Sequence, residues 1–289
     1  MGDGTPRFRF VQLELPWELG PPEGRYVLRG HAGEPEHVLV LGVTGGRRPR
    51  PRRALGGVRF PRAAPSPEPP TVAVTRATLV DAAPMADHDA AQAWLAAADL
   101  QAEAQRAVAV LNTVLHAHRI VRADPFVREI ALDQALVVRV GIGSGEQVAD
   151  GQWADARVVP PAPGRRERRA GALRPQERLA ALMSGRDVVL AAEELTLRAR
   201  LDLDRGRTRE AALQVRVALE AALAELQAWA HRTDLAQRLD ELRDLRGGVG
   251  AAANRALEGG LDPGQIADVE HAVARLEAAL AARVAGGLE

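Results

Sequence analysis

Residues 186–230, RDVVLAAEELTLRARLDLDRGRTREAALQVRVALEAALAELQAWA, constrain the fold of this 289-residue chain more than any other segment. Apolar side chains recur three and four positions apart in its second half, at Val215, Leu219, Ala222, Leu226 and Trp229. This period is typical of an amphipathic helix with one buried face. The turn Asp204-Arg205-Gly206-Arg207 contains a glycine, the residue that most often ends helices. The segment therefore predicts two amphipathic helices joined by a tight turn.

The sequence after this hairpin continues the helical pattern. Asp234 and Gln237 are spaced as in a capping box, and Gly247-Gly248 predicts the end of the helix that they start. Asp262-Pro263 marks the start of a last helix, because proline is favoured at the first helical position. That helix carries an apolar stripe at Ile266, Val269, Val273, Leu276 and Leu280. Residues 176–289 are thus predicted to form an antiparallel helical bundle, preceded by a Pro/Arg-rich linker at 161–175.

The first 160 residues mix strand and helix signals. A single long helix is predicted at 87–121, ended by Asp124-Pro125. Residues 46–70, rich in proline and arginine, are predicted to form a disordered loop. Short apolar or alternating runs predict strands at 8–15, 25–30, 37–45, 71–80 and 135–145, and residues 146–153 are expected to return as a further strand. The predicted fold class is therefore α+β, with a mixed region at 1–160 followed by the helical bundle.

Composition narrows the classes of function. The 38 basic residues are all arginine and are balanced by 38 acidic residues, so no overall charge draws the chain toward nucleic acid or lipid. Arginine without lysine is typical of a GC-rich coding sequence and indicates a bacterial source. The absence of cysteine excludes disulfides and thiolate chemistry. Because no export signal and no run of about 18 apolar residues is present, we expect a cytoplasmic protein with no membrane partner.

Groups able to carry out catalysis are few. His116 and His118 lie two positions apart on the predicted helix and face different directions, so they are not expected to share a metal ion. The acidic residues at 193–194 and 202–204 have an arginine such as Arg198 three or four positions away, which predicts solvent-exposed ion pairs. We therefore predict no catalytic residue, no metal site and no cofactor.

One glycine-rich turn offers an alternative, an enzyme that holds a phosphate. Gly141, Gly143, Ser144 and Gly145 follow a predicted strand, and glycines let backbone amides approach a phosphate closely. The segment lacks the Lys-Ser/Thr of a P-loop, and no helix is predicted to begin there. A plain hairpin turn is the favoured interpretation, and phosphate binding stays open beside it.

Two arginine clusters offer another alternative, nonspecific nucleic-acid binding. They consist of Arg47, Arg48, Arg50, Arg52 and Arg53 in the predicted loop, and of Arg165, Arg166, Arg168 and Arg169 in the predicted linker. Each contact of an arginine with a phosphate contributes affinity that falls with salt. No aromatic side chain for base stacking lies within either cluster, so a solvated linker is the favoured interpretation.

The helix pair at LDLDRGRTREAALQVRVALEAALAEL, residues 201–226, resembles tetratricopeptide-type hairpins and, together with the later helices, HEPN-type bundles. No repeat of about 34 residues recurs, which argues against a tetratricopeptide array. HEPN ribonucleases carry an Arg-x4-6-His motif on a helix, and no arginine precedes His231 or His271 at that spacing. The resemblance thus implies a non-catalytic module. We expect an interaction or scaffold protein that binds a protein partner or a second copy of itself.

Overall fold

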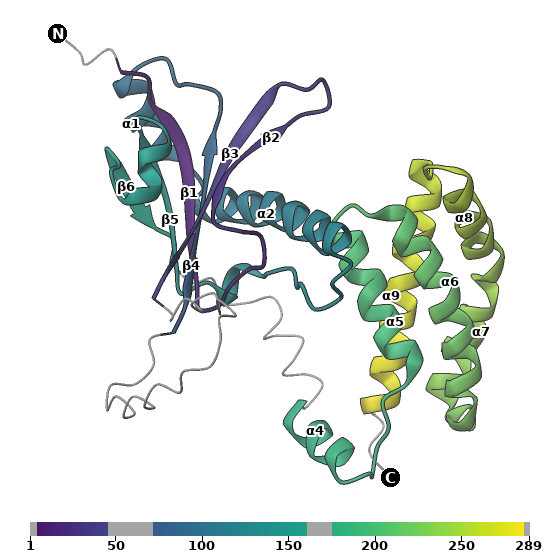
Figure 1. Cartoon of the computed structure of the whole chain (residues 1–289). Coiled ribbons are helices and arrows are strands. Elements are labelled where there is room, and N and C mark those ends of the chain that lie inside the picture. The colour runs from purple at the N-terminus through teal and green to yellow at the C-terminus, as the bar shows by residue number, and fades with distance from the viewer. Residues whose placement is uncertain (1–4, 46–71, 161–174, 286–289) are drawn as a thin grey trace, which may run out of the picture. The chain divides into compact units, whose positions relative to one another are not determined.

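The computed structural model describes residues 5–45, 72–160 and 175–285, and the chain divides into two compact units (Figure 1). Unit 1 comprises Met1–Ala162 and unit 2 comprises Pro163–Glu289. The α+β fold class is confirmed, because unit 1 contains a six-stranded antiparallel sheet and the described part of unit 2 is built of helices.

The sheet of unit 1 has the strand order β2-β3-β4-β1-β5-β6, and all neighbouring strands are antiparallel. Its strands are β1 (Phe8–Leu15), β2 (Gly24–Arg29), β3 (Pro35–Thr44), β4 (Val74–Asp81), β5 (Val137–Gly143) and β6 (Asp155–Val158). Strands β1 to β5 confirm the five strands predicted from short apolar or alternating runs. Such runs are a local signal of the sequence, so they were readable without knowledge of the fold.

Two helices cover one face of this sheet. Leu13 and Leu15 of β1 are buried in one apolar core together with side chains of α1 (His88–Ala97) and α2 (Leu100–Arg122). The long α2 runs beside the sheet in Figure 1. This layer explains the helical periodicity between residues 88 and 122, since one stripe of each helix faces the strands.

The other face of the sheet is covered in part by η2 (Glu146–Asp150), a short 3-10 helix. Its Val148 is buried against Phe10 of β1. Beside them the buried amide of Gln12 donates a hydrogen bond to Thr78 Oγ1 at 3.0 Å. A polar pair therefore sits inside this second, smaller core with its donor satisfied.

Two expectations for unit 1 are wrong. The helix expected at 87–121 is two helices, because the Asp99 side chain accepts hydrogen bonds from the N–H groups of Gln101 and Ala102 and starts α2 anew. The strand expected at 146–153 is η2, and the chain returns to the sheet only at β6. Gly151, at φ 86°, ends η2 in the left-handed conformation, which is incompatible with a continuing strand.

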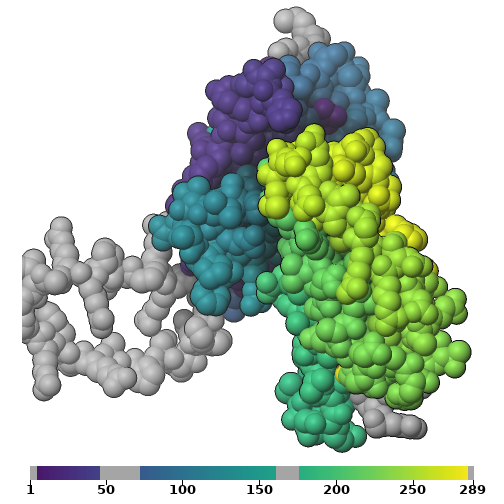
Figure 2. Space-filling view, turned by 90° about the vertical axis from the view of Figure 1, so that its right-hand side faces the viewer, coloured from purple at the N-terminus to yellow at the C-terminus, as the bar shows by residue number. Residues whose placement is uncertain are grey.

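Unit 2 consists of α4 (Pro175–Met183), α5 (Ala191–Asp204), α6 (Thr208–Glu225), η3 (Leu226–Trp229), α7 (Thr233–Asp244), α8 (Arg246–Glu258) and α9 (Pro263–Ala285). The predicted hairpin is confirmed as α5 and α6, with Gly206 at φ 70° in the turn. Leu219 of α6 and Leu276 of α9 are buried in one common core. Figure 2 shows the green and yellow atoms of this unit in contact with one another.

Gly247-Gly248 does not end a helix, contrary to the expectation. The two glycines lie in the first turn of α8, and α7 ends earlier, at Asp244. Leu245 between the two helices has φ −77° and ψ −13°, so the chain changes direction without a left-handed residue. The glycines are tolerated because a helix can start with them, although they cost conformational entropy.

Candidate interaction surface

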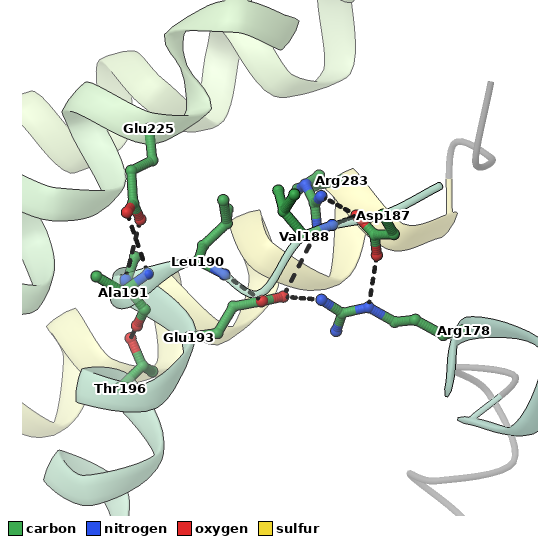
Figure 3. A network of polar contacts seen from close by, with 10 residues as sticks. Arg178, Asp187, Val188, Leu190, Ala191, Glu193, Thr196, Glu225 and Arg283 are labelled. Atoms are coloured by element: carbon green, nitrogen blue, oxygen red, sulfur yellow. Dashed lines mark hydrogen bonds and ion pairs between the residues drawn. The ribbon is translucent and has the colours of Figure 1, made fainter. Parts of the chain in front are cut away.

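Charged side chains of unit 2 form a buried network around the segment that leads into α5 (Figure 3). Asp187 lies at its centre, with only 3% of its side chain exposed. One carboxylate oxygen accepts from Arg178 Nε of α4 at 3.1 Å, and the other accepts from the Val188 N–H at 2.8 Å and bonds to Arg283 of α9. One carboxylate thus links two helices that are distant in sequence.

Glu193, in the first turn of α5, extends this network. Its Oε1 lies 2.5 Å from Arg178 Nη2 and 3.7 Å from Arg283 Nη1. Its Oε2 accepts the Leu190 N–H at 3.0 Å, which satisfies a backbone donor at the start of the helix. Arg283 also lies over the Trp229 ring, with Cζ 4.6 Å from the ring centroid. Both guanidinium groups are therefore held from more than one side.

A second carboxylate reaches the same helix end from α6. Glu225 accepts hydrogen bonds from the N–H groups of Ala191 and Ala192, both at 3.0 Å. The partial positive charge at a helix N-terminus stabilises negative side chains. This contact fixes the end of α6 against the start of α5 and closes the hairpin.

These contacts shift the proton affinities of the buried groups. Burial raises the pKa of Asp187, but the hydrogen bonds from Val188, Arg178 and Arg283 outweigh it and leave that pKa below its ordinary value. Burial lowers the pKa of Arg178, but hydrogen bonds to Asp187 and Glu193 outweigh it and leave that pKa raised. Both groups are therefore charged at neutral pH, and the network has the electrostatics of a structural clamp.

The structure corrects the expectation that acidic residues of this unit form exposed ion pairs. The Glu193 side chain is 12% exposed and the Asp202 side chain 11%. Asp202 accepts from Arg207 Nε at 2.7 Å and from the Gln214 amide, so it ties the hairpin turn to α6 instead of pairing with Arg198. The expectation does hold for Glu194 and Arg198, whose exposed side chains lie 2.8 Å apart.

The outer faces of α5 and α6 carry apolar side chains that the bundle does not cover. Leu197 and Leu201 lie four residues apart on α5 and expose 66% and 37% of their surfaces. Leu213 and Val217 have the same spacing on α6 and expose 37% and 55%. Residues four apart lie on one side of a helix. We call these four residues the α5/α6 outer face.

The glycine-rich turn is placed at the end of β5, where its glycines serve packing. A Cβ on Gly141 would overlap the Asp155 carbonyl oxygen and lie 2.7 Å from the Phe10 ring, and one on Gly143 would overlap Val148 Cγ1. Ser144 Oγ accepts a hydrogen bond from Arg7 Nη1 at 2.5 Å, and Gly145 precedes η2 at φ 127°. The space above the first two glycines is filled by backbone and side-chain atoms of the same unit, which gives their small size a reason that involves no ligand.

The histidines of α2 lie in separate environments. His116 Nδ1 is 3.8 Å from Glu129 Oε1, whereas the ring of His118 lies beside Gly20. Across the described ranges no three His, Asp or Glu side chains are grouped to hold a metal ion. No helix within these ranges is both long and apolar enough to cross a membrane.

Both arginine clusters lie outside the described residues. This applies to Arg47, Arg48, Arg50, Arg52 and Arg53 and to Arg165, Arg166, Arg168 and Arg169. Nucleic-acid binding by them stays a prediction.

The network around Asp187 was missed by sequence reasoning. Its two arginine partners lie 9 and 96 residues away, so no local spacing connects the three residues. Only the pairing of Leu190 with Glu193 follows a recognisable local spacing, that of a helix start.

Comparison with known proteins found no match among protein-family models, curated proteins or solved structures. The resemblance of residues 201–226 to tetratricopeptide-type and HEPN-type hairpins therefore stays a prediction.

Proposed function

We propose that this chain is a non-catalytic interaction protein, and that unit 2 binds another protein or a second copy of the chain through the α5/α6 outer face. The observation that carries this proposal is the exposure of Leu197 and Val217, which lie in the middle of two well-packed helices. Burying a Leu or Val side chain contributes about 1.5–3 kcal/mol. Partial burial of these apolar side chains therefore supplies free energy for association.

The charged groups of the same unit support a non-catalytic role. Asp187, Glu193 and Asp202 are the acidic groups enclosed by the described part of the bundle, and each forms hydrogen bonds with arginine. Catalytic carboxylates need a reacting group within hydrogen-bond reach. Here the arginines occupy those positions, so the carboxylates hold helices together.

Light scattering on the full chain across the micromolar range tests the self-association form of the proposal. The expected result is a mass that rises with concentration. The double variant Leu197→Glu/Val217→Glu should stay monomeric, because it places charge on the α5/α6 outer face without touching the core. Val158→Glu in unit 1 is a matched control, since Val158 is 62% exposed, and it should behave like the wild type.

A monomeric wild type throughout this range refutes self-association and leaves a different protein as the partner. Affinity purification from the source organism with the same variants then tests that form. A protein recovered with the wild type and with Val158→Glu, but not with Leu197→Glu/Val217→Glu, supports the proposed surface. Equal recovery with all three refutes it.

The two alternatives stay predictions, each with its own measurement. Retention on heparin or duplex DNA at low salt, lost when Arg47 to Arg53 are replaced by glutamine, would support nucleic-acid binding. Inorganic phosphate that perturbs the NMR signals of Gly141 to Gly145 would support the phosphate turn.

A further inference from the structure

The end of α2 in unit 1 projects three large apolar side chains into solvent. Ile120 and Val121 in its last turn expose 63% and 83% of their surfaces, and Phe126 in the following loop exposes 82%. We call residues 119–128 the α2 tip. Val121 and Phe126 are the two most exposed large apolar residues in the described ranges, followed by Met183 at 77%.

Phenylalanine is scarce in this chain, with four residues in total. Of the three in the described ranges, Phe8 and Phe10 lie on β1 and pack with Val148 of η2. Phe126 alone faces water. A buried aromatic ring contributes much of the energy of protein interfaces, whereas an exposed one contributes nothing to this unit's core.

The α2 tip is held in one conformation by local hydrogen bonds. Ala123 adopts φ 50° and is the only described non-glycine residue with a positive φ. Its N–H and that of Asp124 close the helix end on carbonyls of the last turn, with Asp124 N donating to Arg119 O at 3.1 Å. The Asp124 carboxylate then accepts the Phe126 N–H at 2.9 Å. Phe126 thus has a fixed backbone position despite its exposure.

The chain after the tip is anchored in the core of unit 1. The buried Asn112 side chain donates to Ile130 O and accepts from Ile130 N, both at 2.8 Å. This paired contact fixes where the loop re-enters the fold. A loop fixed at both ends loses little entropy when it binds, which favours recognition by shape.

The charges beside the three apolar side chains are mostly positive. Arg122 and Arg128 are exposed on either side of Phe126 in the sequence. Asp124 keeps its negative charge while it accepts the Phe126 N–H, and Glu129, whose side chain is 9% exposed, lies near His116. Three arginines, Arg119, Arg122 and Arg128, therefore outnumber the one carboxylate within the tip. An apolar centre with an arginine rim is complementary to an apolar pocket with an acidic rim.

We propose that the α2 tip is a second binding surface, and that it docks into an acidic groove of another protein with Phe126 seated in an apolar pocket. A protein groove is favoured over an anionic bilayer because a fluid lipid surface gains nothing from a side chain held in one position. In addition, one aromatic and two aliphatic side chains are too few for stable membrane attachment. With the α5/α6 outer face as the other surface, the chain would join two partners as a scaffold.

A selection with a defined probe tests this surface. The probe is a display library of repeat proteins with a randomised concave surface, selected for binding to the full chain. The expected binders carry an excess of Asp and Glu, and many compete with one another for the α2 tip. Phe126→Ser should weaken these binders roughly tenfold or more, as removal of a central interface anchor does. Arg122→Gln/Arg128→Gln should weaken them less and reduce the dependence of binding on salt.

Leu257→Ser, which alters a side chain of α8 that is 67% exposed, is the matched control and should leave binding unchanged. Circular dichroism should show every variant folded, since each changes an exposed residue. Binders that avoid the α2 tip, or that lack acidic residues, overturn the proposal. Two other results overturn the choice of occupant. One is sedimentation with vesicles of phosphatidylcholine and phosphatidylserine that depends on Phe126. The other is a dimer that Phe126→Ser dissociates.

Discussion

Replacing Arg283 by Met should destabilise unit 2 by about 3 kcal/mol. The Arg283 side chain is 6% exposed and Asp187 is 3% exposed, so water does not readily replace the contacts that the variant loses. The variant loses the charge-assisted hydrogen bond to Asp187, worth about 1.5–3 kcal/mol, and the cation–π contact with Trp229, worth about 0.5–2 kcal/mol. Arg178 still faces Asp187 after the change, which keeps the loss below the ~5 kcal/mol upper range for breaking a buried pair. Methionine preserves most of the apolar stem and so isolates the charge.

Arg178→Met is the matched comparison, because it removes the other arginine from the same carboxylate. Arg178 joins α4 to the bundle, and α4 buries little apolar surface, with Leu179 and Met183 57% and 77% exposed. A nine-residue helix is unstable by itself. This variant should therefore release α4 while the global free energy of unfolding changes by less than about 1 kcal/mol.

Urea unfolding followed by circular dichroism at 222 nm measures the first effect, since most described helical residues belong to unit 2. Hydrogen exchange of residues 176–183 measures the second. Equal losses of unfolding free energy in the two variants would refute the assignment of Arg283 to the core and Arg178 to the α4 contact. So would unchanged protection of α4 in Arg178→Met.

Three further predictions concern other contacts. Asp187→Asn should make the stability of unit 2 depend less on pH in the acid range. In the folded wild type the pKa of Asp187 is lowered, so the unfolded state binds more protons. The wild type therefore has this stabilisation above the unfolded pKa of about 3.9 and loses it as the pH falls through the folded pKa. Urea midpoints from pH 7 to pH 2 check this, and a slope identical to the wild type would contradict it. Asn112→Ala should lower the free energy of unfolding of unit 1 by about 2–3 kcal/mol, because it removes two buried hydrogen bonds. Hydrogen exchange at residues 124–134 should become faster. Unchanged exchange there would show that other contacts fix the loop. Gly143→Ala should lower the free energy of unfolding of unit 1 by about 1–3 kcal/mol, because the added methyl group overlaps Val148. Gly42→Ala adds a methyl group in open space and should leave stability unchanged. Equal melting temperatures for the two variants would rule out the packing role of Gly143.

The elements that were predictable are those specified by local pattern. The alternation in FRFVQLEL predicts β1 with its bounds, and the apolar period of residues 215–229 predicts α6. The sequence did not predict the break between α1 and α2, because Asp99 fits the helical pattern as well as its neighbours do. Only the structure shows that its backbone is extended and that it caps α2. The helix period alone does not distinguish a cap from an interior aspartate.

The candidate surfaces were less predictable than the fold. Leu197 and Leu219 have the same chemistry and both lie on amphipathic helices, yet one is 66% and the other 1% exposed. Which stripe of a helix is covered depends on where α8 and α9 pack, and that is a property of the whole bundle. The exposure of Phe126 follows likewise from the left-handed turn at Ala123, for which an alanine gives no sequence signal.

Arginines of unit 2 form ion pairs with acidic residues that are far away in the sequence. Arg200 forms two hydrogen bonds with Glu277, 77 residues away, at 2.8 and 3.0 Å. Those hydrogen bonds outweigh burial and raise the pKa of Arg200. Arg246 binds Glu220 in the same two-bond manner across 26 residues. A guanidinium reaches such partners because it is long and presents donors in a fixed fork. The absence of an acid beside Arg47 to Arg53 in the sequence therefore does not by itself predict that these groups bind phosphates, and the same holds for Arg165 to Arg169, which have only Glu167 among them. Only a loss of binding in their glutamine variants would.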